Sequence, residues 1–142
     1  MTIVLDSSAT LAWIYADELT PTIQRVFEYV VADHACVPSL WRLEVANSLT
    51  MGVKRGRIDA AFRDAALTDL ALLNITTDPH TDDFAWSSTI RLADRCKLTL
   101  YDAAYLELAH RLGCPLATLD QELRAAAGAL GVPLFGAVAA AP

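Results

Sequence analysis

Four acidic residues occupy positions at which a chain of alternating strands and helices places carboxylates beside a ligand. They are Asp6, Glu44, Asp102 and Asp120. Asp6 and Asp120 each close a short apolar run, and the carboxyl ends of parallel strands open into the crevice where such folds bind ligands. Carboxylates that converge there repel one another unless a cation neutralises them. Hard divalent ions prefer oxygen ligands, so the pattern predicts a divalent-metal centre.

Each acid also has a structural explanation when it is considered alone. Asp6 and Asp120 precede predicted helices and suit the N-cap position, which stabilises a helix by ~1 kcal/mol. Asp102 lies three residues after Thr99, in a segment that resembles a capping box. Glu44 is harder to explain in this way, because it interrupts the apolar side of a predicted helix. The three capping positions leave both interpretations open, whereas Glu44 favours a functional role.

The elements that would position these acids alternate between strand and helix. Short apolar runs predict strands at 2–5, 35–37, 75–77, 116–119 and 132–135. Helical spacing and caps predict helices at 7–16, from 21 onward, at 39–55, from 59 onward, and at 82–95, 100–112 and 121–130. Strands that alternate with helices favour a parallel sheet covered on both faces. The first and fourth strands would then flank the crevice that receives Asp6 and Asp120.

The size and composition of the chain fit one domain. At 142 residues it is long enough to bury a core, and we expect a single domain over 1–142 with a frayed tail at 137–142. No apolar stretch approaches the ~20 residues that span a bilayer, and no cleavable leader pattern is seen. The hydrophobic content of 54% therefore predicts apolar surface for a homodimer or another protein partner, not for a membrane.

Cysteine usage points away from a disulfide framework and from a zinc site. The three cysteines are scattered and show no C-x-x-C or Cys/His spacing; they are Cys36, Cys96 and Cys114. This pattern favours a reducing, cytoplasmic setting. The three histidines likewise show no spacing suited to a metal or to acid–base pairing.

Four segments together resemble the PIN-domain ribonucleases, most closely the VapC-type toxins of bacterial toxin–antitoxin pairs. The segments are IVLDSSA at 3–9, PSLWRLEVAN at 38–47, LYDAAY at 100–105 and ATLD at 117–120. They occur in the order and spacing of that family and cover essentially the whole chain. The resemblance implies a Rossmann-like, three-layer α/β fold with a five-stranded parallel sheet flanked by helices. It also implies Mg²⁺ or Mn²⁺ in the crevice, endonucleolytic cleavage of RNA, and a cognate antitoxin protein as partner.

The resemblance assigns expected roles to individual residues. The acidic quartet of the family corresponds to Asp6, Glu44, Asp102 and Asp120. Its supporting polar positions correspond to Ser8, Asn47 and Thr118. Glu122 stands where some relatives carry a further acid, although an exposed acid in the first turn of a helix is the simpler interpretation. Metal ions held by the quartet would polarise the scissile phosphate, help deprotonate the attacking water and stabilise the leaving oxygen.

Charge bears on the RNA expectation in both directions. The net charge of −6, from 11 basic and 17 acidic residues, counts against a nucleic-acid partner, although a bound divalent ion reverses the local sign. The one dense basic cluster contains Lys54, Arg55 and Arg57. These residues either contact RNA phosphates or simply match the negative end of a helix.

Other α/β proteins with an acid after the first strand fit less well. A haloacid-dehalogenase phosphatase needs a second Asp two positions after Asp6, where this chain has Ser8. A response-regulator receiver needs a Lys after the fifth strand, where this chain has Gly136. A non-catalytic PIN-like scaffold that binds RNA or protein is the alternative from a different class. Its usual mark is the loss of an acid, and all four acids are present.

Overall fold

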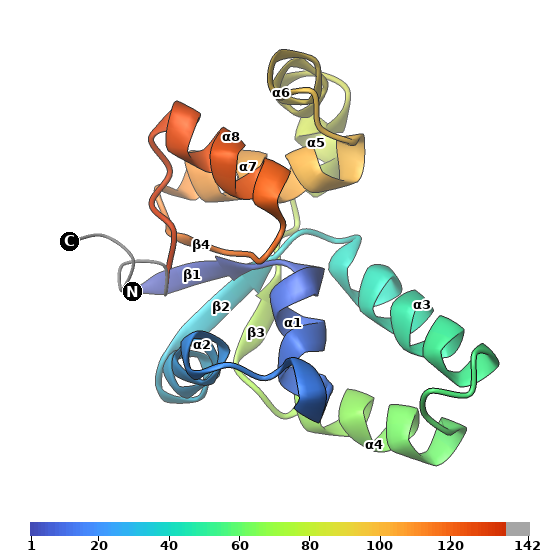
Figure 1. Ribbon diagram of the computed structural model, residues 1–142. Helices are drawn as coiled ribbons and strands as arrows, with labels where there is room; N and C mark the ends of the chain where they lie inside the picture. Colours follow the sequence, from blue (N-terminus) through green and yellow to red (C-terminus); the bar gives the residue numbers. More distant parts are fainter. Residues whose placement is uncertain (136–142) are drawn as a thin grey trace.

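The centre of the molecule is a parallel sheet with helices on both faces, as seen in a computed structural model that describes residues 1–135 (Figure 1). Its four strands are β1 (Thr2–Leu5), β2 (His34–Val37), β3 (Ile75–Thr77) and β4 (Leu116–Ala117). Their order is β3-β2-β1-β4, and every neighbouring pair is parallel. The α/β parallel architecture predicted from the sequence is confirmed. The expected tail at 137–142 lies outside the described residues.

The fifth strand predicted at 132–135 is reduced to a single bridge. Leu134 pairs with Leu116 in the parallel sense. The Leu116 N–H donates to the Pro133 carbonyl at 2.8 Å, and the Phe135 N–H donates to the Leu116 carbonyl at 2.9 Å. Pro133 has no N–H, so it cannot donate to a ladder. The expectation of five strands is therefore corrected to four strands and a bridge within residues 1–135.

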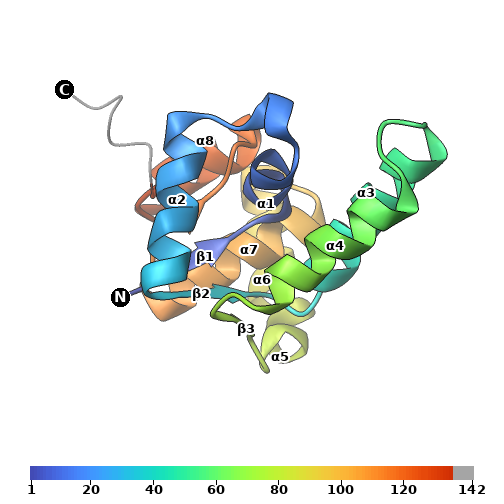
Figure 2. The same ribbon diagram turned by 90° about the horizontal axis from the view of Figure 1, so that it is seen from below.

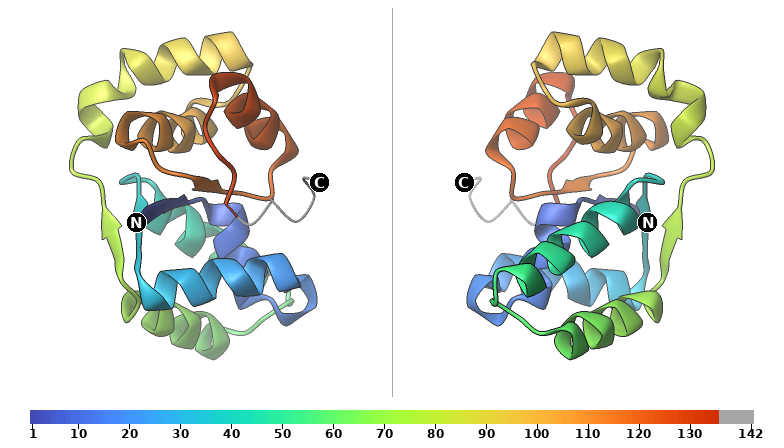
Figure 3. Two further views of the ribbon diagram at one scale, coloured as in Figure 1. Left: turned by 90° about the vertical axis from the view of Figure 1, so that its left-hand side faces the viewer. Right: turned by 90° about the vertical axis from the view of Figure 1, so that its right-hand side faces the viewer.

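The helices form layers above and below this sheet. They are α1 (Ser7–Ile14), α2 (Pro21–Ala32), α3 (Trp41–Lys54), α4 (Ala60–Ala71), α5 (Thr81–Ala85), α6 (Ser88–Cys96), α7 (Leu100–Leu112) and α8 (Gln121–Leu130), with a short 3₁₀ turn at Ala16–Glu18. Figures 1 and 3 show α1, α2 and α4 on one side of the sheet and α7 and α8 on the other, with α6 packed outside α7. Figure 2 shows α3 and α4 side by side, extending beyond the sheet.

α7 is the central helix of its layer. Seven consecutive residues, 103–109, are buried, so this helix has no solvent-facing side over two turns. It contacts α6, α8 and β1. None of the helices within residues 1–135 combines the length and the apolar character needed to cross a membrane.

Several helices begin at a side-chain N-cap, and the caps predicted at Asp59, Thr99 and Asp120 are confirmed. The side chains of Thr20, Asp59, Thr99 and Asp120 each accept a hydrogen bond from a backbone N–H in the first turn of the helix that follows.

Two helix predictions need correction. The helix predicted from 39 begins at Trp41, and the Ser39 N–H instead donates to the Thr81 hydroxyl at 3.0 Å. The single helix predicted at 82–95 is two helices. Ser87 leaves the helical conformation there, with φ −127° and ψ −96°, and its hydroxyl donates to the Phe84 carbonyl. Serine side chains compete for backbone groups in this way, so serine is compatible with a break between two helices.

Candidate active site

Asp6 lies buried where β1 ends and α1 begins. Its Oδ1 accepts hydrogen bonds from the Ala9 N–H at 3.0 Å and from the Ser8 hydroxyl at 2.7 Å. Its Oδ2 accepts a hydrogen bond from the Thr118 hydroxyl at 2.5 Å. Burial raises the pKa of Asp6 from 3.8 to about 6, although these three donors favour the charged form. Asp6 is therefore an N-cap and also a carboxylate whose charge is poorly compensated.

Two hydroxyls connect the end of β1 with the segment that follows β4. The Thr118 hydroxyl accepts a hydrogen bond from the Asp120 N–H at 3.0 Å while it donates to Asp6. The Ser8 hydroxyl accepts a hydrogen bond from the Leu119 N–H at 3.0 Å. Ser8 and Thr118, both expected beside the metal, thus hold Asp6 and Asp120 on neighbouring strand ends.

Glu44 extends from the first turn of α3 toward α7. Its Oε1 accepts a hydrogen bond from the Tyr105 hydroxyl at 2.5 Å, and Tyr105 is only 1% exposed. Burial raises the pKa of Glu44, the Tyr105 hydroxyl opposes this shift, and the charge of Asp102 adds to it. The two elements α3 and α7, far apart in the sequence, therefore meet at a carboxylate.

Asp102 is the acid around which the others gather. It lies in the first turn of α7, where its N–H donates to the Thr99 hydroxyl at 3.1 Å. Burial raises its pKa, and the negative charges of Asp120 and Glu122 raise it further. Asp102 in turn raises the pKa of both Asp6 and Glu44. The fold therefore brings the four predicted acids into one electrostatic cluster, with Glu122 at its exposed margin.

The cluster offers oxygen donors but is not a closed metal cage. Across residues 1–135, no three His, Cys, Asp or Glu side chains stand as a ready-made metal-binding group. Raised pKa values at Asp6, Glu44 and Asp102 are the signature of burial and of like charges that repel. A hard divalent ion would relieve that repulsion, and carboxylate oxygens are the ligands it prefers. The chemistry of the donor set therefore fits a hard divalent ion such as Mg²⁺ or Mn²⁺.

The remaining predicted residues lie along α3 and beyond its end. Asn47 is exposed, one turn after Glu44. Lys54 and Arg55 are exposed, and within the described chain their side chains make no hydrogen bond or ion pair. Arg57 differs from both. Its guanidinium binds Asp17 at 2.9 Å and Glu18 at 2.8 Å and stacks 3.6 Å from the centre of the Tyr15 ring. 

Arg57 is thus occupied by intramolecular partners, and of the three basic candidates it is the one least available to a phosphate.

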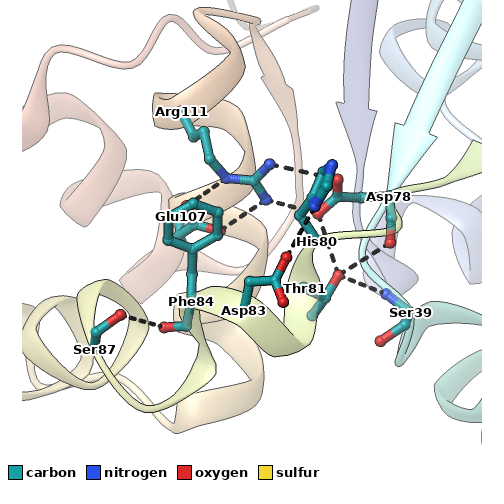
Figure 4. Close-up of polar contacts among 9 residues, drawn as sticks. All are labelled: Ser39, Asp78, His80, Thr81, Asp83, Phe84, Ser87, Glu107 and Arg111. Atoms are coloured by element: carbon teal, nitrogen blue, oxygen red, sulfur yellow. Dashed lines mark hydrogen bonds and ion pairs between the residues drawn. The ribbon is translucent and has the colours of Figure 1, made fainter.

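Sequence reasoning missed a largely buried ion-pair network between α7 and the end of β3 (Figure 4). Arg111 of α7 binds Glu107, one turn earlier, at 2.7 Å, and Asp78, directly after β3, at 2.6 Å. The Thr81 hydroxyl donates to Asp78 and accepts the N–H of Ser39, which lies just before α3. The network therefore ties the end of β3 and the approach to α3 to α7. The spacing of Glu107 and Arg111 by four residues was the available signal.

A second missed contact fixes the start of α3 against α1. The Trp41 indole N–H donates to the Thr10 hydroxyl at 3.0 Å, and that hydroxyl donates to the Asp6 carbonyl at 2.8 Å. The backbone of Asp6 is thereby linked to α3, the helix that carries Glu44. Neither residue has a spacing in the sequence that would have identified this contact.

Comparisons with known proteins agree with the fold. Residues 3–129 match the sequence profile of the PIN domain. A Mycobacterium bovis protein named VapC ribonuclease Mb0985 is 33% identical over 121 residues, which cover 85% of this chain and 87% of that protein. Ribonuclease VapC3 of Pyrobaculum aerophilum is 29% identical over 133 residues, which cover 94% of this chain and 100% of that protein. 

The crystal structure of PAE2754 from Pyrobaculum aerophilum superposes with a TM-score of 0.66 at 25% identity. The superposition covers 89% of this chain and 84% of that one.

Proposed function

Because the chain belongs to the PIN-domain family, we propose that it is a divalent-metal-dependent endoribonuclease and the toxin of a toxin–antitoxin module. The observation that carries the proposal is the cluster of four carboxylates around Asp102, at the carboxyl edge of the sheet. RNA as the substrate class is supported by the relatives that are named VapC ribonucleases.

The residues of the site have separable tasks in this proposal. The four acids would hold Mg²⁺ or Mn²⁺, which when bound supplies positive charge at the scissile phosphate and makes a nearby water more acidic. Ser8 and Thr118 orient the two oxygens of Asp6. Tyr105 holds one oxygen of Glu44 and leaves the other free for a ligand. No histidine or lysine is needed as a general base.

Cleavage of RNA by the purified chain, with and without divalent ions, tests the proposal. We expect cleavage with Mg²⁺ or Mn²⁺ and none in EDTA. Glu44→Gln, purified in the same way, serves as the control for contaminating nuclease, and Glu28→Gln, on an exposed position of α2, serves as the matched charge control. Equal cleavage by wild type and Glu44→Gln would refute the assignment. RNA binding without cleavage under any metal would identify the chain as a non-catalytic scaffold.

We propose a homodimer as the assembly, supported by large apolar side chains on the surface. Leu43 of α3 is 76% exposed, Tyr101 at the start of α7 is 63% exposed, and Trp86 between α5 and α6 is 90% exposed. Isolated surface residues of this kind are normal, whereas several large ones favour an interface. Light scattering at tens of micromolar is expected to give the mass of two chains, and a monomer there would contradict the dimer.

For the antitoxin, we propose the hollow between α1 and α4 as a point of attachment. Its volume is about 270 Å³, and Trp13, Ile14 and Phe62 line it. Phe62 is 44% exposed, so an apolar side chain of a partner can cover it. Phe62→Asp is expected to weaken co-purification with the protein encoded beside this one, and unchanged co-purification would place the attachment elsewhere.

A further inference from the structure

Helix α6 ends in a basic segment that the acidic cluster does not use. Arg91 and Arg95 lie one turn apart on the same side of α6, and Lys97 directly follows the helix. All three are exposed. Within residues 1–135 their side chains make no hydrogen bond or ion pair, in contrast to Arg57 and Arg111. These cations are therefore free to bind a ligand.

Arg95 and Lys97 line an open hollow between α6 and α8. The hollow has a volume of about 450 Å³, and its opposite wall is α8, with Glu122 at the near end. Glu122 lies close enough to Asp102 for its charge to act on that carboxyl group. Lys97 is also only two residues before Thr99, which caps α7, the helix whose first turn carries Asp102. The hollow and the candidate metal site are therefore adjacent.

The backbone at Lys97 is held in a conformation that normally requires glycine. Lys97 has φ 56° and ψ 43°, and it is the one non-glycine residue with positive φ in the described part of the chain. The other positions of this kind are glycines: Gly56, Gly113 and Gly131. Glycine ends a helix there with less strain, because a Cβ crowds the backbone in the left-handed region. Lys97 therefore departs from the glycine that ends α7 and α8, Gly113 and Gly131.

The basic residues at the end of α3 lie well away from Glu44. Lys54 lies ten residues after Glu44 on one straight helix, so it is about 15 Å away at about 1.5 Å per residue. In the hollow of α6 and α8 two cations face one carboxylate, so the local charge is positive in a chain of net charge −6. A polyanion that approaches Asp102 from this side meets unpaired cations in the hollow.

We propose that Arg95 and Lys97 form a phosphate-binding site for the RNA strand beside the cleavage centre, with Arg91 extending it along α6. This inference rests on the proposed ribonuclease function and adds the path of the substrate. Arg95 offers a planar fork of donors, and Lys97 offers a point charge. Because both would contact the backbone of RNA, the site positions the strand without reading its sequence.

Binding of a short, labelled, random-sequence single-stranded RNA tests this site. Fluorescence anisotropy is measured over a series of salt concentrations, with Ca²⁺ in place of Mg²⁺ so that the RNA stays intact. The variants are Lys97→Gly, Arg95→Gln and the two combined. Lys97→Arg is the rescue, and Arg25→Gln on α2 is the matched control, since Arg25 is exposed on the other side of the sheet.

The double variant is expected to bind RNA roughly tenfold more weakly at low salt. Its plot of log affinity against log salt should become shallower by about 1.4, since each phosphate contact with a single strand accounts for about 0.7. Lys97→Gly alone should bind more weakly and yet melt about 3 °C higher, because the strain at residue 97 is relieved. A rise in melting temperature excludes unfolding as the cause of weaker binding.

Unchanged affinity and slope in the double variant, or an equal loss in Arg25→Gln, would overturn the site. In that case wild-type RNA cleavage continues and the proposed function stands. If the wild-type protein neither binds nor cleaves RNA, the proposed function fails and the phosphate site fails with it. The two failures are thus distinguished by the wild-type measurement.

Discussion

Replacement of Asp6 with asparagine should stabilise the metal-free protein while it abolishes RNA cleavage. Burial raises the pKa of Asp6 from 3.8 to about 6, so the folded state binds this proton more tightly than the unfolded state does. Stability therefore falls as pH rises from about 4 to about 6, and the full cost of the buried charge is present above that range. About 2 pKa units at about 1.4 kcal/mol each give a cost of about 3 kcal/mol at pH 7.

Asparagine has the shape of aspartate and removes the charge. Its Oδ1 can still accept the Ala9 N–H, which keeps the N-cap of α1. Its amide must face the Thr118 hydroxyl, which now donates to Asp6 and would have to accept instead. Rearrangement of one hydrogen bond costs about 1 kcal/mol. The expected net gain is therefore about 2 kcal/mol at neutral pH.

Denaturant unfolding in EDTA, at several pH values from 4 to 8, measures this gain. The stabilisation of Asp6→Asn relative to wild type should be largest at pH 7 to 8. Near pH 4, where folded wild type already has Asp6 protonated, only the cost of the rearranged hydrogen bond should remain and the variant should be slightly less stable. Asp94→Asn, an exposed position on α6, controls for the change in net charge. Mn²⁺ should stabilise wild type and have little effect on Asp6→Asn. A variant that is less stable than wild type at pH 7, or a difference independent of pH, would refute the reasoning from burial.

Three further changes address the contacts around the acids. Glu44→Gln should abolish cleavage. The melting temperature of the metal-free variant should be equal to or higher than that of wild type, because repulsion from Asp102 is relieved. A lower melting temperature with activity retained would identify Glu44 as structural. Tyr105→Phe removes the hydroxyl that donates to Glu44. Mn²⁺ binding, measured by calorimetry, should weaken roughly tenfold, since a hydrogen bond to a charged group is worth about 1.5–3 kcal/mol. Unchanged Mn²⁺ affinity would show that the hydroxyl does not position the carboxylate. Asp78→Asn removes one of the two carboxylates that pair with Arg111, while Glu107 remains, and should cost about 1.5–3 kcal/mol at pH 7. Burial opposes ionisation of Asp78, yet the hydrogen bond and the charge of Arg111 lower the pKa of Asp78 below its usual value of 3.8. The stability that the ion pair contributes should therefore be lost as pH falls below 3.8. A stability difference between Asp78→Asn and wild type that does not change in acid would contradict the ion-pair account.

Local features of this fold could be predicted from the sequence because they depend on few neighbouring residues. A cap needs only one side chain and the N–H three residues later, and Asp59, Thr99 and Asp120 all act in this way. The acids were identifiable because Asp6 and Asp120 follow apolar runs that form strands, and the carboxyl ends of those strands lie side by side in the sheet.

The features that were missed depend on distant partners. The hydrogen bond from Tyr105 to Glu44 joins residues 61 apart, and no local spacing encodes it. The run at 132–135 is apolar enough for a strand, but Pro133 supplies no donor to extend the pairing. Likewise, helical periodicity continues through Ser87 although the backbone does not, because the break lies in backbone angles that the spacing of apolar side chains does not encode.

The complete burial of residues 103–109 has a consequence for how this protein can change. A helix with one exposed face accepts substitutions there, whereas α7 has no such face over this stretch. Its first turn carries Asp102, its middle carries the donor to Glu44, and its last turn carries Arg111. In a scan of all single substitutions, α7 should therefore tolerate fewer replacements than α2 or α4. Divergence among descendants of this chain should accumulate on those outer helices while α7 stays nearly constant.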